Sequence, residues 1–107
     1  MSAVWRAVSR HDDGVGVVRL EGELDLSVVN ELEDELQQAL QNAATGLHVD
    51  VADVTYIDSS SVGAIMRTFA VALNEGKTLR VVNARGIPRR VLELAGVSDI
   101  LGLDGTE

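Results

Sequence analysis

Apolar residues recur along the chain with two different periods, and each period predicts one kind of element. In the stretch Leu47–Val51 apolar and polar residues alternate strictly, which predicts a strand with one buried face. Valine-containing runs predict three further strands over residues 4–9, 15–22 and 78–83. The turn signal Asp12-Asp13-Gly14 separates the first two of these strands, so we expect them to pair as a hairpin.

Two longer segments place apolar residues three or four positions apart, as the buried face of a helix does. The first helix is expected to start at a Ser27 cap and to close at Thr45-Gly46, with the stripe Val28, Leu32, Leu36, Ala39, Leu40 and Ala43. Residues 52–58 are then expected to form a connecting loop. The second helix is expected to start at Ser60 and to stop at Gly76, with the stripe Val62, Ile65, Met66, Phe69 and Leu73.

A third, shorter helix is expected around Pro88, which suits a first helical turn because it has no N–H to leave unpaired. Its apolar face is expected to consist of Val91, Leu92 and Ala95, and Gly96 is expected to end it. Residues 98–101 are expected to form a last short turn, and residues 104–107 a frayed tail.

The predicted order of elements is β-β-α-β-α-β-α. Helical crossovers between strands join parallel neighbours, whereas a tight hairpin joins antiparallel ones. The fold class expected is therefore α/β, with a mixed four-stranded β-sheet and helices on at least one face. A length of 107 residues favours one domain, spanning residues 1–107.

Acidic residues outnumber basic ones by 17 to 9, and the formal net charge is −8. Binding to a nucleic acid or to an anionic membrane draws on clustered Lys and Arg. This chain has one lysine, Lys77, so we expect no nucleic-acid partner and no direct membrane insertion. Seven acids and no base lie between Glu21 and Glu35; they form either a solvated helix face or a surface that attracts a basic partner.

The composition also disfavours several other classes of protein. The chain contains no cysteine, so we expect neither disulfides nor cysteine-based metal chemistry. No apolar run approaches the roughly 20 residues of a membrane-spanning helix, and a charge at Arg6 comes too early for a signal peptide. These observations favour a globular protein of the cytoplasm.

The most informative candidate chemistry lies where the second helix is expected to begin. Three hydroxyls, Ser59, Ser60 and Ser61, follow Asp58 directly. A serine at a helix start either caps free backbone N–H groups or accepts a phosphate, which the same N–H groups and the helix dipole stabilise. Asp58 is expected to accept hydrogen bonds in an Asx turn, and Gly63 either allows close packing on the sheet or is a tolerated helix glycine.

Features typical of enzymes are scarce in the sequence. The two histidines, His11 and His48, adjoin a predicted turn and lie on the polar face of a predicted strand, as solvated surface residues do. Ser60 lacks the G-x-S-x-G setting of a nucleophile elbow, and no phosphate-binding glycine loop or metal-ligand cluster is present. We expect no catalysis, no cofactor and no metal site, although a small hydrolase using a serine remains an alternative.

Three motifs resemble those of one known family. The stretch Tyr56–Met66 is similar to the D-S-S-G-L-G segment of anti-sigma-factor antagonists of the STAS domain family, in which the second serine is phosphorylated. The stretch Gly22–Asp25 is similar to the family's G-E-L-D motif, and Arg90–Val97 to its late R-x-L-x-x-x-G helix. The chain departs from the pattern at Ser61 and Val62, where the family has glycine and leucine.

The resemblance implies a STAS fold and a regulatory function. The phosphorylation site would be Ser60, with Ser59 and Ser61 as alternatives, and the partner-binding region would include Asp25, Asp58, Ser59, Ser61 and Gly63. The unphosphorylated protein would bind an anti-sigma factor with serine kinase activity and so release the sigma factor. Phosphorylation would end the complex, and a phosphatase would reset it.

A second function within the same family stays open. The chain would then be a STAS adaptor subunit of a stressosome-type complex or of a membrane transporter. In that case the same surface would bind a partner without necessarily being phosphorylated.

Overall fold

The computed structural model describes residues 4–103. These residues fold around one sheet of four strands in the order β1-β2-β3-β4. Strand β1 (Trp5–Asp12) runs antiparallel to β2 (Val15–Leu24), whereas β3 (Gly46–Ile57) and β4 (Thr78–Val82) continue the sheet in parallel. The mixed four-stranded sheet expected from the sequence is confirmed. The tail expected over residues 104–107 lies outside the described residues.

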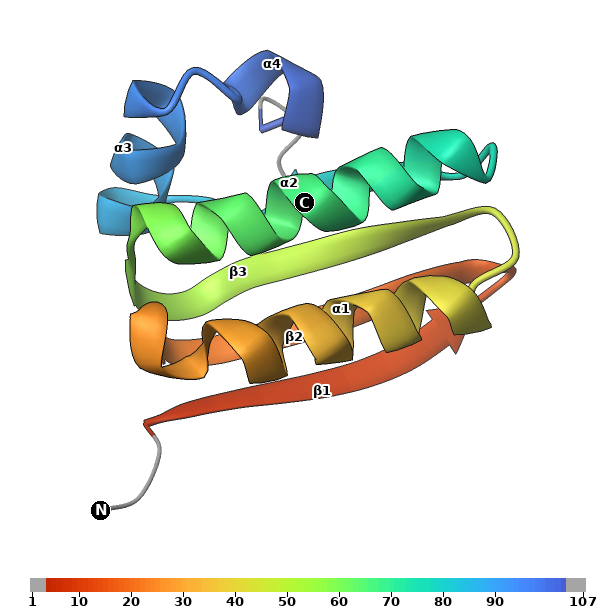
Figure 1. The fold of residues 1–107 in the computed structure, drawn as a ribbon, viewed down its shortest axis with the longest axis horizontal. Helices are drawn as coiled ribbons and strands as arrows, with labels where there is room; N and C mark the ends of the chain where they lie inside the picture. The colour runs from red at the N-terminus through yellow and green to blue at the C-terminus, as the bar shows by residue number, and fades with distance from the viewer. Residues whose placement is uncertain (1–3, 104–107) are drawn as a thin grey trace.

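Two long helices, α1 (Val29–Asn42) and α2 (Ser59–Asn74), lie side by side on the same face of the sheet (Figure 1). This arrangement follows from the strand order, because successive right-handed crossovers in one direction place their helices on one face. A short 3-10 turn, η1 (Leu26–Val28), leads from β2 into α1. None of the helices in the described residues is long and apolar enough to cross a membrane.

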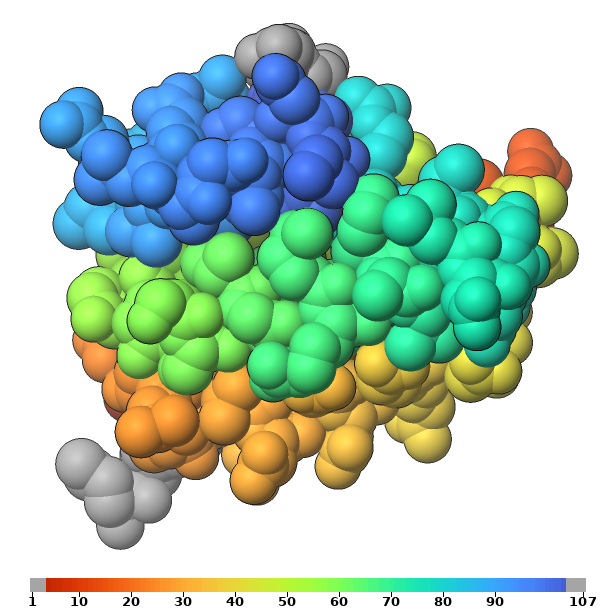
Figure 2. Space-filling model, turned by 45° about the horizontal axis from the view of Figure 1, so that its top comes forward, coloured from red at the N-terminus to blue at the C-terminus, as the bar shows by residue number. Residues whose placement is uncertain are grey.

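Two shorter helices, α3 (Gly86–Leu94) and α4 (Ser98–Leu101), follow β4 and contact the β3–β4 side of the sheet. Figure 2 shows α1 in orange, α2 in green and the α3–α4 segment in blue as three adjoining bands on the surface. Leu92 of α3 and Leu101 of α4 are fully buried and belong to the same core as the residues of the sheet. Residues 98–101, which were expected to form a short turn, form the helix α4.

Strand β3 is longer than the alternating pattern predicts, and the loop expected over residues 52–58 is wrong. The strand continues to Ile57, and Val51, Val54 and Ile57 point into the core. These buried residues are three positions apart, so the sequence does not show the alternation that is typical of a strand. The spacing arises because the pairing of β2 with β3 shifts register at two irregularities. Strand β1 likewise continues to Asp12, which leaves a two-residue turn in which both residues have positive φ.

The core fills the space between the sheet and the two long helices. Every residue of the predicted α1 stripe, from Val28 to Ala43, is buried. The predicted α2 stripe is wrong at Leu73, which is 63% exposed, because α2 turns Ala64, Thr68 and Ala72 into the core instead. Ala95, expected on the apolar face of the third helix, is also exposed, and it lies one residue beyond the end of α3 at Leu94.

Truncation of one leucine tests this packing. Leu36→Ala removes a fully buried side chain of α1, so we expect the free energy of unfolding to fall by about 2–5 kcal/mol. Leu73→Ala is the matched control, because the same change at an exposed position should alter stability by about 0.5 kcal/mol or less. Denaturant titration of both variants measures the difference, and equal midpoints would contradict the assignment of the core.

Candidate functional site

Two carboxylates stand at the carboxyl ends of neighbouring parallel strands. Leu24 and Ile57, the last residues of β2 and β3, pair with each other, and Asp25 and Asp58 follow them directly. The Asp58 N–H donates to the Leu24 carbonyl oxygen at 3.2 Å, which holds the two chain ends together. Carboxyl ends of parallel strands are a common place for binding sites in α/β folds.

Gly22 fits the end of β2 against β1 in a way that no other residue could. Its φ is +92°, and an added Cβ would lie 1.8 Å from the Val4 carbonyl oxygen. The neighbouring Glu23 N–H donates to that same oxygen at 3.0 Å. The glycine of the Gly22–Asp25 motif therefore permits the close strand contact that precedes Asp25.

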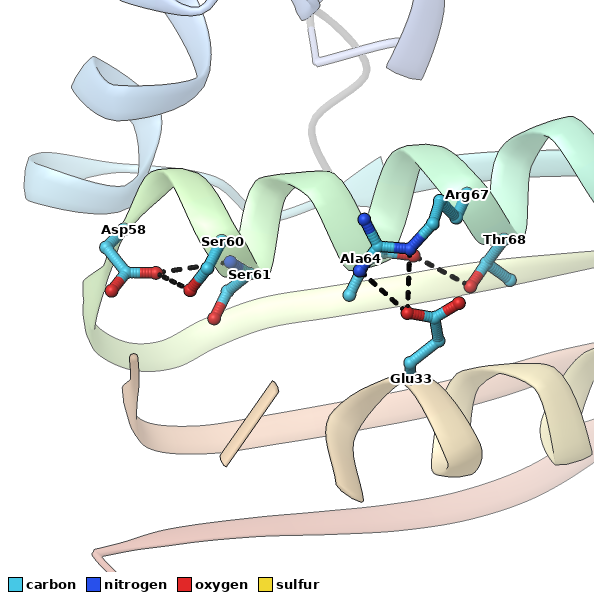
Figure 3. Close-up of polar contacts among 7 residues, drawn as sticks. All are labelled: Glu33, Asp58, Ser60, Ser61, Ala64, Arg67 and Thr68. Atoms are coloured by element: carbon cyan, nitrogen blue, oxygen red, sulfur yellow. Dashed lines mark hydrogen bonds and ion pairs between the residues drawn. The ribbon is translucent and has the colours of Figure 1, made fainter. Parts of the chain in front are cut away.

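Asp58 is the residue that caps α2. Its Oδ1 atom accepts from the Ser61 N–H at 3.1 Å and from the Ser60 hydroxyl at 2.6 Å (Figure 3). Its Oδ2 atom accepts from the Leu26 N–H of η1 at 3.1 Å. The expectation that Ser60 caps the helix is wrong, because the stronger carboxylate acceptor one residue before the helix takes that role.

These hydrogen bonds determine how Asp58 ionises. Partial burial raises the pKa of Asp58, but the hydroxyl of Ser60 and the backbone N–H groups of Ser61, Leu26 and Ser60 together outweigh it. The pKa of Asp58 therefore lies below its usual range, because these donors favour the charged form. Asp58 is a fixed negative charge at the start of α2.

The three consecutive serines differ sharply in exposure. Ser59 is exposed and is the first residue of α2, Ser60 is half-buried, and Ser61 is completely buried. The Ser61 hydroxyl finds no hydrogen-bond partner among residues 4–103 (Figure 3). Asp58, rather than Ser59, makes the side-chain hydrogen bonds that order this loop.

Asp25 has a similar role at the end of the preceding strand. Its side chain accepts from the Ser27 N–H at 2.9 Å and from the Ser27 hydroxyl, and it caps η1. The predicted Ser27 cap is wrong, since Ser27 donates to Asp25 and α1 begins at Val29 without a side-chain cap. In both places an aspartate two residues before the serine accepts the hydrogen bond of its hydroxyl, and that aspartate caps η1 in one case and α2 in the other.

One interpretation of Gly63 was that it allows α2 to pack closely on the sheet, and the structure contradicts this. It is half-buried, and an added Cβ would lie 3.2 Å from the Arg67 guanidinium. Arg67 reaches from α2 to Glu33 of α1, with its Nη2 atom 2.7 Å and its Nε atom 2.8 Å from one carboxylate oxygen (Figure 3). The glycine thus leaves space for an arginine that joins the two helices, and the small residue packed against the core is Ala64.

Two of the four acids of α1 are exposed, and the other two, Glu33 and Glu35, are half-buried. Glu31 and Asp34 are exposed, while the half-buried Glu33 is neutralised by Arg67. A solvated helix face, one of the two interpretations of this segment, matches these positions. Attraction of a basic partner remains a prediction.

Both histidines lie far from the three serines along the sheet. His11 pairs with Gly16 and His48 pairs with Val17, at the end of the sheet where β2 begins. Ser60 follows the opposite end, so the described residues do not assemble a Ser-His pair there. Within residues 4–103 no group of three or more His, Asp and Glu side chains is placed to hold a metal ion.

The low pKa of Asp58 predicts how stability depends on pH. Ionised Asp58 stabilises the folded protein above the pKa of the unfolded chain, about 4, and this contribution is lost as pH falls through the lower folded pKa. Asp58→Asn removes the charge, so wild type should be the more stable protein at pH 7 and its advantage should shrink as the solution is acidified below about pH 4. Urea titrations of both proteins across this range provide the measurement, and an advantage independent of pH would contradict the prediction.

The sequence matches known proteins over most of its length. The family model described as Mlab, STAS domain, matches residues 7–102. The anti-sigma-B factor antagonist of Staphylococcus epidermidis is 32% identical over 98 residues, an alignment covering 91% of this chain and 90% of that protein.

Solved structures agree with this result. An anti-sigma factor antagonist from Mycobacterium paratuberculosis superimposes with a TM-score of 0.82 at 26% identity, covering 92% of this chain and 84% of that one. The unphosphorylated form of SpoIIAA shares the fold, with a TM-score of 0.77 at 21% identity over 89% of this chain and 84% of that one. Bacillus SpoIIAA in its phosphorylated form does so as well, with a TM-score of 0.69 at 22% identity, covering 89% and 87%. Matched by the family model over residues 7–102, the chain belongs to the STAS domain family.

Proposed function

We propose that this protein is an anti-sigma-factor antagonist that is switched by phosphorylation of Ser60. The unphosphorylated form binds an anti-sigma factor with serine kinase activity and thereby releases a sigma factor in the cytoplasm. The observation that carries the proposal is the half-buried Ser60 hydroxyl, 2.6 Å from the Asp58 carboxylate in the first turn of α2. The relative from Staphylococcus epidermidis, named an anti-sigma-B factor antagonist, supports the same function.

The exposure of the three serines supports Ser60 over its neighbours. Ser61 is completely buried, so its hydroxyl cannot enter a kinase active site without local unfolding. Ser59 is accessible, but Asp58 holds the Ser60 hydroxyl in one orientation and makes no such side-chain contact with Ser59. Ser60 combines access with a fixed position. SpoIIAA, which shares this fold, has been solved in unphosphorylated and phosphorylated forms.

A phosphate at Ser60 would change the charge of this surface while leaving the fold intact. The Ser60 oxygen would take the γ-phosphoryl group of ATP, ADP would leave and the hydroxyl proton would be released. The product carries about −1.5 to −2 charges at pH 7, and the free N–H groups of a helix start tolerate such a group. It would stand beside ionised Asp58, so a partner surface fitted to a neutral hydroxyl would meet a strongly negative one.

The remaining candidate residues contribute to this proposal in different ways. Asp25, Asp58 and Ser59 lie at the end of the sheet where the partner would dock, and their side chains are exposed or half-buried. Ser61 and Gly63 support the surface from within, since one is buried and the other makes room for Arg67. A phosphatase would remove the phosphate and restore binding.

Paired pull-downs with Ser60→Ala and Ser60→Asp test the proposal. We expect the alanine bait to retain an anti-sigma factor with a kinase domain from the native lysate, and the aspartate bait to lose it because of the added charge. Mass spectrometry identifies the retained proteins. Ser9→Ala and Ser9→Asp are the matched controls, and both should bind, because Ser9 is an exposed serine of β1 that pairs with Val18, away from the end of the sheet where the partner would dock.

Two other outcomes would contradict the proposed function or the proposed phosphorylation site. Transporter or scaffold subunits held equally by both Ser60 baits would favour the STAS adaptor function. Incubation of wild type with the retained kinase and ATP should place phosphate on Ser60, and phosphate found on Ser59 instead would overturn the assignment of the site.

A further inference from the structure

Leu26 is an exposed apolar side chain that is tied directly to the candidate site. It begins η1, and 70% of the residue is accessible to solvent. Its backbone N–H donates to the Oδ2 atom of Asp58 at 3.1 Å, although 32 residues separate the two in sequence. The apolar periodicity gave no sign of this contact, because Leu26 lies between a strand and a helix and belongs to neither pattern.

The two oxygens of Asp58 hold two different segments of the chain. Oδ1 accepts from the Ser60 hydroxyl and from the Ser61 N–H, both in α2. Oδ2 accepts from Leu26 in the turn between β2 and α1. A single carboxylate therefore connects the hydroxyl of Ser60 to the position of the Leu26 backbone.

Phosphorylation of Ser60 would disturb this carboxylate in two ways. The phosphoserine ester oxygen carries no proton, so the hydrogen bond from Ser60 to Oδ1 is necessarily lost. The phosphate also repels the ionised carboxylate and competes with it for the N–H groups at the start of α2. Displacement of Asp58 would then weaken its hydrogen bond with the Leu26 N–H.

We propose that Leu26 is an apolar contact for the anti-sigma factor, and that Asp58 couples its position to the phosphorylation state of Ser60. The proposal rests on the function proposed above and identifies what the partner requires: an apolar pocket beside the groups that face Ser60. A side chain presented on a backbone already fixed by hydrogen bonds loses little freedom on binding, as a good interface anchor does.

Other exposed leucines lack this connection. Leu73, 63% exposed, is in the last turn of α2, and Leu94, 74% exposed, is the last residue of α3. Leu73 lies at the opposite end of α2 from the residues that Asp58 caps. Leu73 is thus a control of the same residue type and similar exposure.

The coupling is tested in the free protein, without any partner. Phosphoserine introduced at position 60 by genetic encoding should increase amide hydrogen exchange at Leu26 about tenfold relative to the unmodified protein, as expected for loss of a local hydrogen bond. The Ser27 N–H, which Asp25 holds in the same turn, is the internal control and should not change. An unchanged Leu26 exchange rate would overturn the coupling.

The contact is tested by affinity for the anti-sigma factor retained by the Ser60→Ala bait. Leu26→Ala should weaken binding about tenfold or more, while Leu26→Met should restore it and Leu73→Ala should leave it unchanged. Equal dissociation constants for wild type and Leu26→Ala would overturn the contact even if Ser60→Asp abolishes binding. If the Ser60→Ala bait retains no anti-sigma factor, the proposed function and the contact both fail, whereas the amide measurement decides the coupling by itself.

Discussion

The parallel pairing of β2 with β3 is the constraint on which the rest of the molecule depends. These two central strands carry the buried residues Val18, Leu20, Val49 and Val51, against which α1 and α2 pack. They also end at the same level, with Leu24 opposite Ile57. The same pairing therefore builds the core and brings Asp25 and Asp58, which are 33 positions apart in the sequence, to one edge.

At that edge of the sheet the carboxylates and the hydroxyls have different roles. Asp25 and Asp58 satisfy the free N–H groups of η1 and α2, which a serine would otherwise have to cap. Ser60 is left with its hydroxyl donating to Asp58, so its oxygen keeps a fixed position while remaining half-exposed. Because Asp58 caps α2, the Ser60 hydroxyl is not needed as a cap and is free to accept a phosphate, which the N–H groups of a helix start also tolerate. This is the physical basis of the function proposed for Ser60.

The surface around the site combines small residues with a few fixed charges. Gly22 allows β1 to approach the end of β2, and Gly63 gives Arg67 the space to reach Glu33. An exposed ion pair of this kind adds little to stability, but it neutralises one acid of α1 close to α2. The negative charge near Ser60 that remains constant is that of Asp58, whose pKa its hydrogen-bond donors keep low.

By itself, the sequence determined the class of fold, the order of its elements, the α1 core stripe and membership of the STAS domain family. Each of these depends on local periodicity or on short motifs, which are present in the chain before it folds. Only the tertiary structure decided that β3 extends to Ile57, because a register shift between strands breaks the alternation on which sequence patterns rely. The tertiary structure also decided that Asp25 caps η1 and Asp58 caps α2. Likewise, only the fold shows that Leu73 is exposed and that Gly63 faces Arg67. The connection of Leu26 to Ser60 through Asp58 belongs to the same group, since it requires two strand ends to meet in space, and residues distant in sequence carry no local signal of such a contact.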